Sequence, residues 1–185
     1  MIETAIEICS KSLSETDDDN LMFGATWLTA DLHHIKSSIS YERNEENHGL
    51  ALSKTAKSIR ESVSEPGDPF FEFWLILSDG QISLSLMAEG RAEEALPLIQ
   101  NLLDYSQRPI EDGSSFPNLE VFLQNSCLCY LLLGKLEEAD NEWTRSEGLI
   151  REQHGEESQL MATLVPRKNL AFTSDCGMDT NWRAP

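Results

Sequence analysis

Apolar residues recur along most of the chain at the three- and four-residue spacing of a helix that buries one face. The alternating pattern of half-buried strands is weak throughout. This pattern predicts three helical hairpins, near residues 21–63, 69–107 and 118–154, and half of a fourth over 160–172. We therefore expect an all-α fold.

Two turn segments nearly repeat each other. Gly90–Ala95 (GRAEEA) and Gly134–Ala139 (GKLEEA) each follow an apolar run, each open another, and lie 44 residues apart. A glycine tolerates the backbone of a tight turn, and an alanine one turn into the next helix lets two helices approach closely. Repetition at a fixed period predicts a helical-repeat solenoid. The same 44-residue step leads upstream to Ala51, and a step of 43 residues leads downstream to Gly177.

The predicted architecture is an α-solenoid of antiparallel hairpins with about three and a half repeats of roughly 44 residues. An N-terminal helix and an acidic linker occupy residues 1–19, the repeat domain 20–177 and an irregular tail 178–185. The helical pattern stops after Gly177, where the second helix of a repeat is expected. A natural half-repeat cap, an interface for another chain and a truncated chain each explain this, and the abrupt loss of pattern favours truncation.

The charge balance narrows the partner classes. The 185 residues include 32 acidic and 14 basic side chains, which gives a net charge of −18. A negative field repels phosphate backbones and anionic lipids, so we expect neither a nucleic-acid nor a membrane partner. The excess either selects a basic partner or is a solvated surface that aids solubility. No apolar run approaches the roughly 20 residues of a membrane span, and the N-terminus lacks the basic start of a secretion signal, so we expect a soluble cytoplasmic protein.

Candidate catalytic chemistry is missing from the sequence. There is no P-loop, dinucleotide-binding glycine loop, zinc-protease motif or nucleophile elbow. Paired glutamates stand beside turns, where they favour the helix dipole. The cysteines show no disulfide or zinc spacing and are interpreted as small buried hydrophobes: Cys9, Cys127, Cys129 and Cys176. We expect no catalytic residue, metal or cofactor, and we assign Trp27, Trp74 and Trp143 to the core.

The third hairpin carries the clearest family pattern. Its late-helix aromatic, turn glycine, early-helix alanine and following aromatic are Tyr130, Gly134, Ala139 and Trp143. These four residues resemble the pattern of tetratricopeptide repeats. The preceding hairpin shares the glycine and alanine but has aliphatic residues at both aromatic positions. The long period resembles kinesin-light-chain-like repeats, and residues 31–44 resemble repeat segments of fungal tetratricopeptide proteins, some of which are attached to NTPase modules.

The resemblance implies a right-handed stack of helix pairs whose first helices line a concave groove that binds peptides or proteins. Its register places these residues in the groove: Lys36, Ser40, Arg43, Gln81, Leu84, Met87, Gln124, Asn125, Leu128, Arg167, Lys168 and Ala171. Only Asn125 occupies the position of the family's carboxylate-clamp asparagine, and the clamp lysines do not follow. The cations in this set suit an acidic peptide or a terminal carboxylate, whereas the alternative is that these are ordinary exposed polar residues.

The leading functional hypothesis is a non-catalytic scaffold that binds a protein or peptide partner through this groove. The alternative is the sensor or oligomerisation region of a larger signalling protein, such as an NTPase-linked repeat protein. Both rest on the repeat architecture, because the sequence names no ligand.

Overall fold

The structure, a computed structural model, describes residues 1–16, 18–43, 48–65, 67–108 and 119–155. These residues form seven helices and no strand, which confirms the all-α prediction. The helices are α1 (Ile2–Glu15), α2 (Asp19–Glu42), α3 (His48–Val63), α4 (Pro69–Ala88), α5 (Ala92–Ser106), α6 (Leu119–Leu132) and α7 (Leu136–His154). The expected half-hairpin over 160–172, Gly177 and the tail lie outside the described residues.

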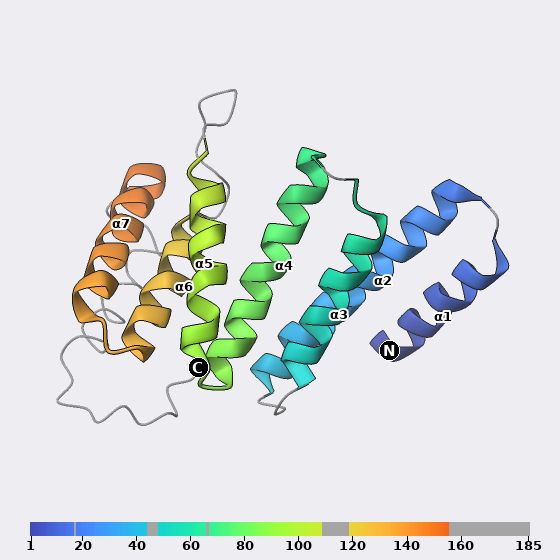
Figure 1. Cartoon of the computed structure of the whole chain (residues 1–185), viewed down its shortest axis with the longest axis horizontal. Coiled ribbons are helices and arrows are strands. Elements are labelled where there is room, and N and C mark those ends of the chain that lie inside the picture. The colour runs from blue at the N-terminus through green and yellow to red at the C-terminus, as the bar shows by residue number, and fades with distance from the viewer. Residues whose placement is uncertain (17, 44–47, 66, 109–118, 156–185) are drawn as a thin grey trace. The chain divides into compact units, whose positions relative to one another are not determined.

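The chain divides into two compact units, Met1–Phe116 and Pro117–Pro185. In the first unit α2 pairs with α3 and α4 with α5, and in the second α6 pairs with α7 (Figure 1). These pairs are the three predicted hairpins. Within the first unit α1 packs on α2 as α3 packs on α4, and α2 also packs directly on α4. Within each unit, consecutive helices therefore stack side by side, as a helical-repeat solenoid requires.

The two repeated turns have the same backbone. Gly90 and Gly134 have φ values of 74° and 71°, in the left-handed region that favours glycine. Each glycine is followed by a residue whose N–H returns to the preceding helix, Arg91 to the Leu86 carbonyl and Lys135 to the Tyr130 carbonyl, both over 2.9 Å. This is the Schellman arrangement that ends a helix at a glycine. The predicted turn role of both glycines is confirmed.

The upstream projection of the period to Ala51 is wrong. Ala95 and Ala139 are fully buried, as predicted, but Ala51 is exposed. The burial pattern of α3 instead aligns Gly49 with those alanines, since buried Ser53 then matches buried Ile99. A Cβ at position 49 would stand 3.5 Å from the Ser37 carbonyl oxygen, so α3 packs directly against the α2 backbone there. The step from the first hairpin to the second is therefore 46 residues, and the next step is 44.

Serine fills many of the crossing points between helices. In the first hairpin the Ser37 hydroxyl of α2 donates to the Gly49 carbonyl over 2.8 Å, and the Ser53 hydroxyl donates to the same carbonyl over 3.0 Å. Small side chains of this kind allow close helix packing while their hydroxyls find backbone acceptors.

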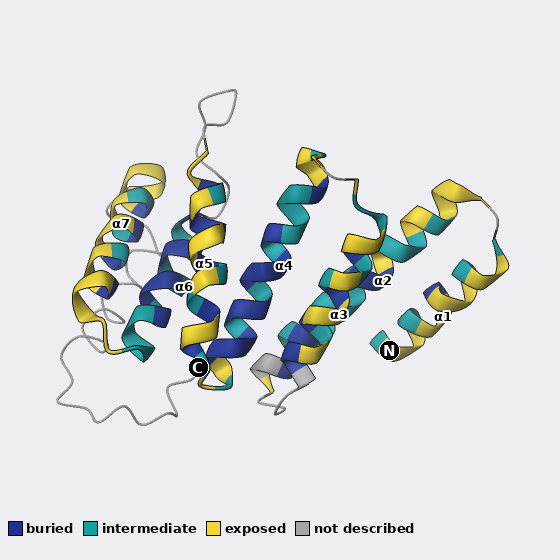
Figure 2. Ribbon diagram, in the orientation of Figure 1, coloured by how far each residue is buried: buried dark blue, intermediate teal, exposed yellow. Residues whose placement is uncertain are grey.

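Helix α4 lies at the centre of the first unit, between α3 and α5. Figure 2 shows buried residues along most of its length. It begins as predicted at Pro69, and the Asp68 carboxylate caps it by accepting the Phe70 N–H over 2.8 Å. The core of the second unit is smaller and gathers around Cys127, Ala139, Trp143 and Ile150.

Candidate interaction site

Helix α2 exposes a stripe of large aliphatic side chains. Leu21, Leu28 and Ile35 are 63%, 51% and 48% exposed and lie seven residues apart, which is close to two helical turns. They therefore lie on one face of α2. Ala30 and Ser37 are completely buried, and Ser37 contacts α3, so the stripe faces away from the hairpin's own core. We call Leu21, Leu28 and Ile35 the α2 stripe.

A separate aromatic cluster joins α2 to α4, and its Trp27 lies about 100° around α2 from Leu28 of the stripe. Its members are Phe23 and Trp27 of α2 and Phe70, Phe71 and Trp74 of α4. The Trp27 ring lies 5.4 Å from Phe70 and 5.8 Å from Trp74 between centroids. Such offset and edge contacts between rings stabilise the junction beyond the burial of their area. Phe70 is nevertheless 51% exposed, so part of the cluster is open to a partner.

A buried arginine of α3 supports the aromatic cluster. The Arg60 guanidinium lies 5.8 Å from the Trp27 centroid and 5.3 Å from the Trp74 centroid. It donates to the Asp31 carboxylate of α2 over 2.6 Å and to the Ser78 hydroxyl of α4 over 2.7 Å. One side chain thus joins three helices through an ion pair, a hydrogen bond and two cation–π contacts.

The polar groups near Arg60 differ in how they are satisfied, and the buried Nδ1 atoms of His33 and His34 have no hydrogen-bond partner within the described residues. Lys57 of α3 donates to the buried Asp79 carboxylate of α4 over 2.6 Å. Desolvation, and secondarily the Arg60 cation, lowers the pKa of His34, while Asp31 opposes this shift. Desolvation also lowers the pKa of His33, assisted by Lys36. Both histidines are therefore neutral near pH 7, and this part of the site serves to hold helices together.

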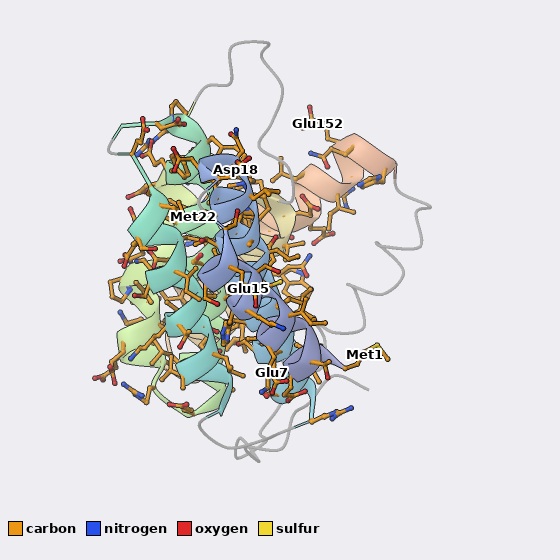
Figure 3. The ribbon with its side chains drawn as sticks, turned by 90° about the vertical axis from the view of Figure 1, so that its right-hand side faces the viewer. Met1, Glu7, Glu15, Asp18, Met22 and Glu152 are labelled. Atoms are coloured by element: carbon orange, nitrogen blue, oxygen red, sulfur yellow. The ribbon has the colours of Figure 1, made fainter. Side chains whose placement is uncertain are left out.

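Acidic side chains lie at the N-terminal end of the α2 stripe. Asp18 and Asp19 are exposed at the start of α2, three and two residues before Leu21. Asp18 also caps α2 by accepting the Asn20 N–H over 2.9 Å. Figure 3 shows Asp18 with Met22 at the beginning of α2, and Glu7 and Glu15 along α1. The apolar surface consequently lies in a negative local field.

The residues predicted for the groove of the first hairpin do not form one surface. Lys36 forms an ion pair with Glu3 of α1 over 2.9 Å, and Ser40 is buried. Arg43 is exposed just beyond the end of α2. Lys36 follows Ile35 by one residue, which turns it about 100° around the helix, away from the α2 stripe. Because Ser40 is buried, the prediction that it faces a partner is wrong.

The other predicted groove residues are only partly accessible. In the second hairpin Gln81 and Leu84 are half-buried and Met87 is buried. In the third, Asn125 and Leu128 are half-buried, and the half-buried Gln124 donates to the Ser146 hydroxyl over 3.3 Å. Arg167, Lys168 and Ala171 lie outside the described residues.

Sequence reasoning missed the α2 stripe and the open part of the aromatic cluster. Two signals were present, namely the seven-residue spacing of Leu21, Leu28 and Ile35 and the four aromatic residues within 70–74. The assignment of Trp143 to the core is confirmed, whereas Trp27 and Trp74 are half-buried members of the cluster.

The cysteines that the structure describes are buried, as predicted: Cys9, Cys127 and Cys129. Burial raises the pKa of the Cys129 thiol to about 11, an effect that Lys135 partly offsets. Such a thiol is unreactive at neutral pH. Among the described residues no group of three or more His, Cys, Asp or Glu side chains is placed to hold a metal ion.

Comparison with models of known protein families gives no match. Comparison with curated proteins likewise gives no match. None of the described helices has the length and apolar character needed to cross a membrane.

Proposed function

We propose that this chain is a non-catalytic protein-interaction scaffold of tetratricopeptide-like helical hairpins, which binds a protein or peptide partner through the outer faces of α2 and α4. The observation that carries the proposal is the α2 stripe, three aliphatic side chains about half exposed in a row. The partly exposed aromatic cluster between α2 and α4 adds further apolar area on the neighbouring side of α2. Exposed apolar surface with a charged border is typical of interaction sites.

We also propose a cytoplasmic location and no nucleic-acid partner. The cysteine positions in the sequence show no disulfide spacing, which suits a reducing compartment. The net charge of −18 opposes binding to phosphate backbones.

Photo-crosslinking tests the proposed face. A photoreactive phenylalanine analogue replaces Gly24, which lies between Leu21 and Leu28 with no atom within 4 Å of its Cβ position. The matched control places the same analogue at Gly148 of α7, which is also helical, exposed and open. We expect a specific partner crosslinked in extracts of the source cells from position 24 and not from position 148.

The crosslink must also depend on the face itself. The double substitution Leu28→Ser and Ile35→Ser removes apolar area that is already half exposed, so the helix should persist while the crosslinked product disappears. The matched double substitution Val121→Ser and Leu136→Ser changes two exposed aliphatic residues of α6 and α7 and should leave the product intact. Equal crosslinking in both double variants would overturn the proposal.

A further inference from the structure

We propose that the occupant of the α2 stripe is a basic amphipathic helix of a partner protein, an inference that rests on the scaffold function proposed above. The seven-residue spacing of Leu21, Leu28 and Ile35 is the spacing at which one helix meets another along a shared seam. Ala25, Leu32 and Ile39 each follow a member of the stripe by four residues and are half-buried, which completes the apolar edge of such a seam.

The dimensions of the stripe set the size of the partner segment. Fourteen residues separate Leu21 from Ile35, so the stripe is about 21 Å long at the helical rise per residue. A partner helix of about four turns covers it. Phe70 stands half exposed on the neighbouring helix, where the aromatic cluster offers a contact for one large apolar side chain of the partner.

The charge around the stripe selects a basic partner. Residues 1–43 contain eight Asp and Glu and three Lys and Arg, a net charge of −5. Two of the three cations are already paired, Lys11 with Glu15 over 3.7 Å and Lys36 with Glu3 over 2.9 Å. Asp18, Asp19 and Glu7, which belong to the same segment, are exposed. A helix with Lys and Arg beside its apolar face gains from this field, whereas an acidic segment is repelled.

The same field disfavours a second copy of this chain as the occupant. Each copy carries a charge of −18, so pairing two α2 stripes would bring together two surfaces of the same negative sign. Like charges placed opposite each other at an interface cost binding free energy. A homodimer through α2 is therefore a competing outcome that the experiment must detect.

Titration of the full-length protein with labelled model peptides tests the partner class. Three peptides of about 18 residues, long enough for four to five helical turns, serve as probes. The first carries leucines on one helical face and lysines elsewhere, the second replaces each lysine by glutamate, and the third scrambles the leucine–lysine sequence. Fluorescence anisotropy gives the dissociation constants at about 0.05 M and about 0.3 M salt.

We expect the leucine–lysine helix to bind at least about tenfold more tightly than either other peptide, with an affinity that falls at the higher salt. Leu28→Ser with Ile35→Ser should weaken this binding about tenfold or more, because the pair removes two of the three apolar side chains of the stripe. Val121→Ser with Leu136→Ser should change it less than twofold.

A second pair of matched double variants tests how much the negative charge contributes to peptide binding. Asp18→Asn with Asp19→Asn keeps the helix cap but removes two negative charges, and we expect it to weaken the leucine–lysine peptide severalfold. Glu137→Gln with Glu138→Gln on α7 removes the same charge from exposed positions elsewhere and should have no comparable effect.

Three results would overturn the inference. They are equal affinity for the lysine and glutamate peptides, equal affinity for the scrambled peptide, and a homodimer in sedimentation experiments that Leu28→Ser with Ile35→Ser dissociates. If crosslinking from position 24 depends on Leu28 and Ile35 while the peptides show no preference, the scaffold function stands and the basic helix does not. If neither the crosslinking nor the peptide binding depends on Leu28 and Ile35, both proposals are wrong.

Discussion

At the scale of single residues, Arg60 is a charged residue at a position that uncharged residues occupy in the other two hairpins. The burial pattern aligns it with Ser106 of α5 and Ile150 of α7. Arg60 is 2% exposed, whereas its ion-pair partner Asp31 is 37% exposed. The two ends of this ion pair therefore lose very different amounts of hydration on folding, and removing one or the other has different consequences.

We predict that Asp31→Ala destabilises the protein more than Arg60→Met does. Asp31→Ala leaves a buried cation without its counterion and should lower the free energy of unfolding by about 2 to 4 kcal/mol. Arg60→Met leaves a carboxylate that water reaches, and its apolar chain still packs between Trp27 and Trp74, so its cost should be about 1 to 2 kcal/mol. Urea denaturation measures both.

The double variant gives the sharper comparison. Adding Arg60→Met to Asp31→Ala removes the uncompensated charge, so the double variant should be more stable than Asp31→Ala alone. If instead the losses of unfolding free energy in the two single variants simply add in the double variant, Asp31 and Arg60 are not coupled. The ion pair then does not join α2 to α3.

A second residue-scale prediction concerns the buried thiol of Cys129. Its pKa is raised from an ordinary 9.0 to about 11, because burial favours the neutral form. The native state thus holds this proton more tightly than the unfolded state. The resulting stability is fully present below pH 9 and is lost as the pH rises towards 11, with a total of about 2 to 3 kcal/mol.

The measurement is the difference in unfolding free energy between the wild type and Cys129→Ala, followed from pH 8 to about 10.5. Taking the difference cancels other groups that titrate in the same range. The wild type should lose its advantage over the variant as the pH rises. In the native protein Cys129 should also react with iodoacetamide much more slowly than in urea, and a constant difference with fast native alkylation would contradict its burial.

At the scale of helices, two glycines of the second unit should respond oppositely to alanine. Gly148 lies within α7 with open space around its Cβ position, so Gly148→Ala should stabilise the protein by about 0.5 to 1 kcal/mol. Gly134 ends α6 at a φ of 71°, where alanine is strained, so Gly134→Ala should destabilise it by about 1 kcal/mol or more. Thermal or urea unfolding of the two single variants provides the test. Effects of the same sign would contradict the assigned turn.

The turns were predictable from sequence, but the register of the first hairpin was not. Gly90 and Gly134 need a left-handed backbone, so the residue type alone identifies the turn. The alanine position is less restrictive, because it requires only a small side chain. Gly49 meets that requirement two residues before Ala51, and a fixed step carried over from later repeats selects the wrong one. Only the packing of α3 against Ser37 distinguishes them.

The candidate site was harder to predict for a related reason. A family register assigns faces by position along the helix, but the actual face of α2 depends on its neighbours. Helix α1 packs on α2 and Lys36 pairs with Glu3, so the side predicted to be open is used within the fold. The apolar residues Leu28 and Ile35 remain outside, where a rule that buries hydrophobic residues would not place them.

At the scale of the whole molecule, the net charge of −18 opposes the compact state. The exposed ion pairs offset little of it, because pairs such as Arg145–Glu142 and Arg151–Glu147 each contribute at most about 1 kcal/mol. The repulsion therefore acts across many carboxylates, and salt should relieve it. We predict that raising NaCl from about 0.02 M to about 0.3 M increases the free energy of unfolding in urea, because the Debye length falls below the spacing of most surface charges.

A single charge reversal separates this general repulsion from local effects. Glu152 is exposed in the last turn of α7, where the helix dipole favours a cation over an anion. Glu152→Lys should stabilise the protein by about 0.5 to 1 kcal/mol at low salt, and Glu152→Gln by about half as much. Both gains should shrink at about 0.3 M salt, since the contributing charges lie at the surface. If the gain from Glu152→Lys persists in salt, a specific contact of the new lysine is responsible, and relief of the surrounding negative charge is not.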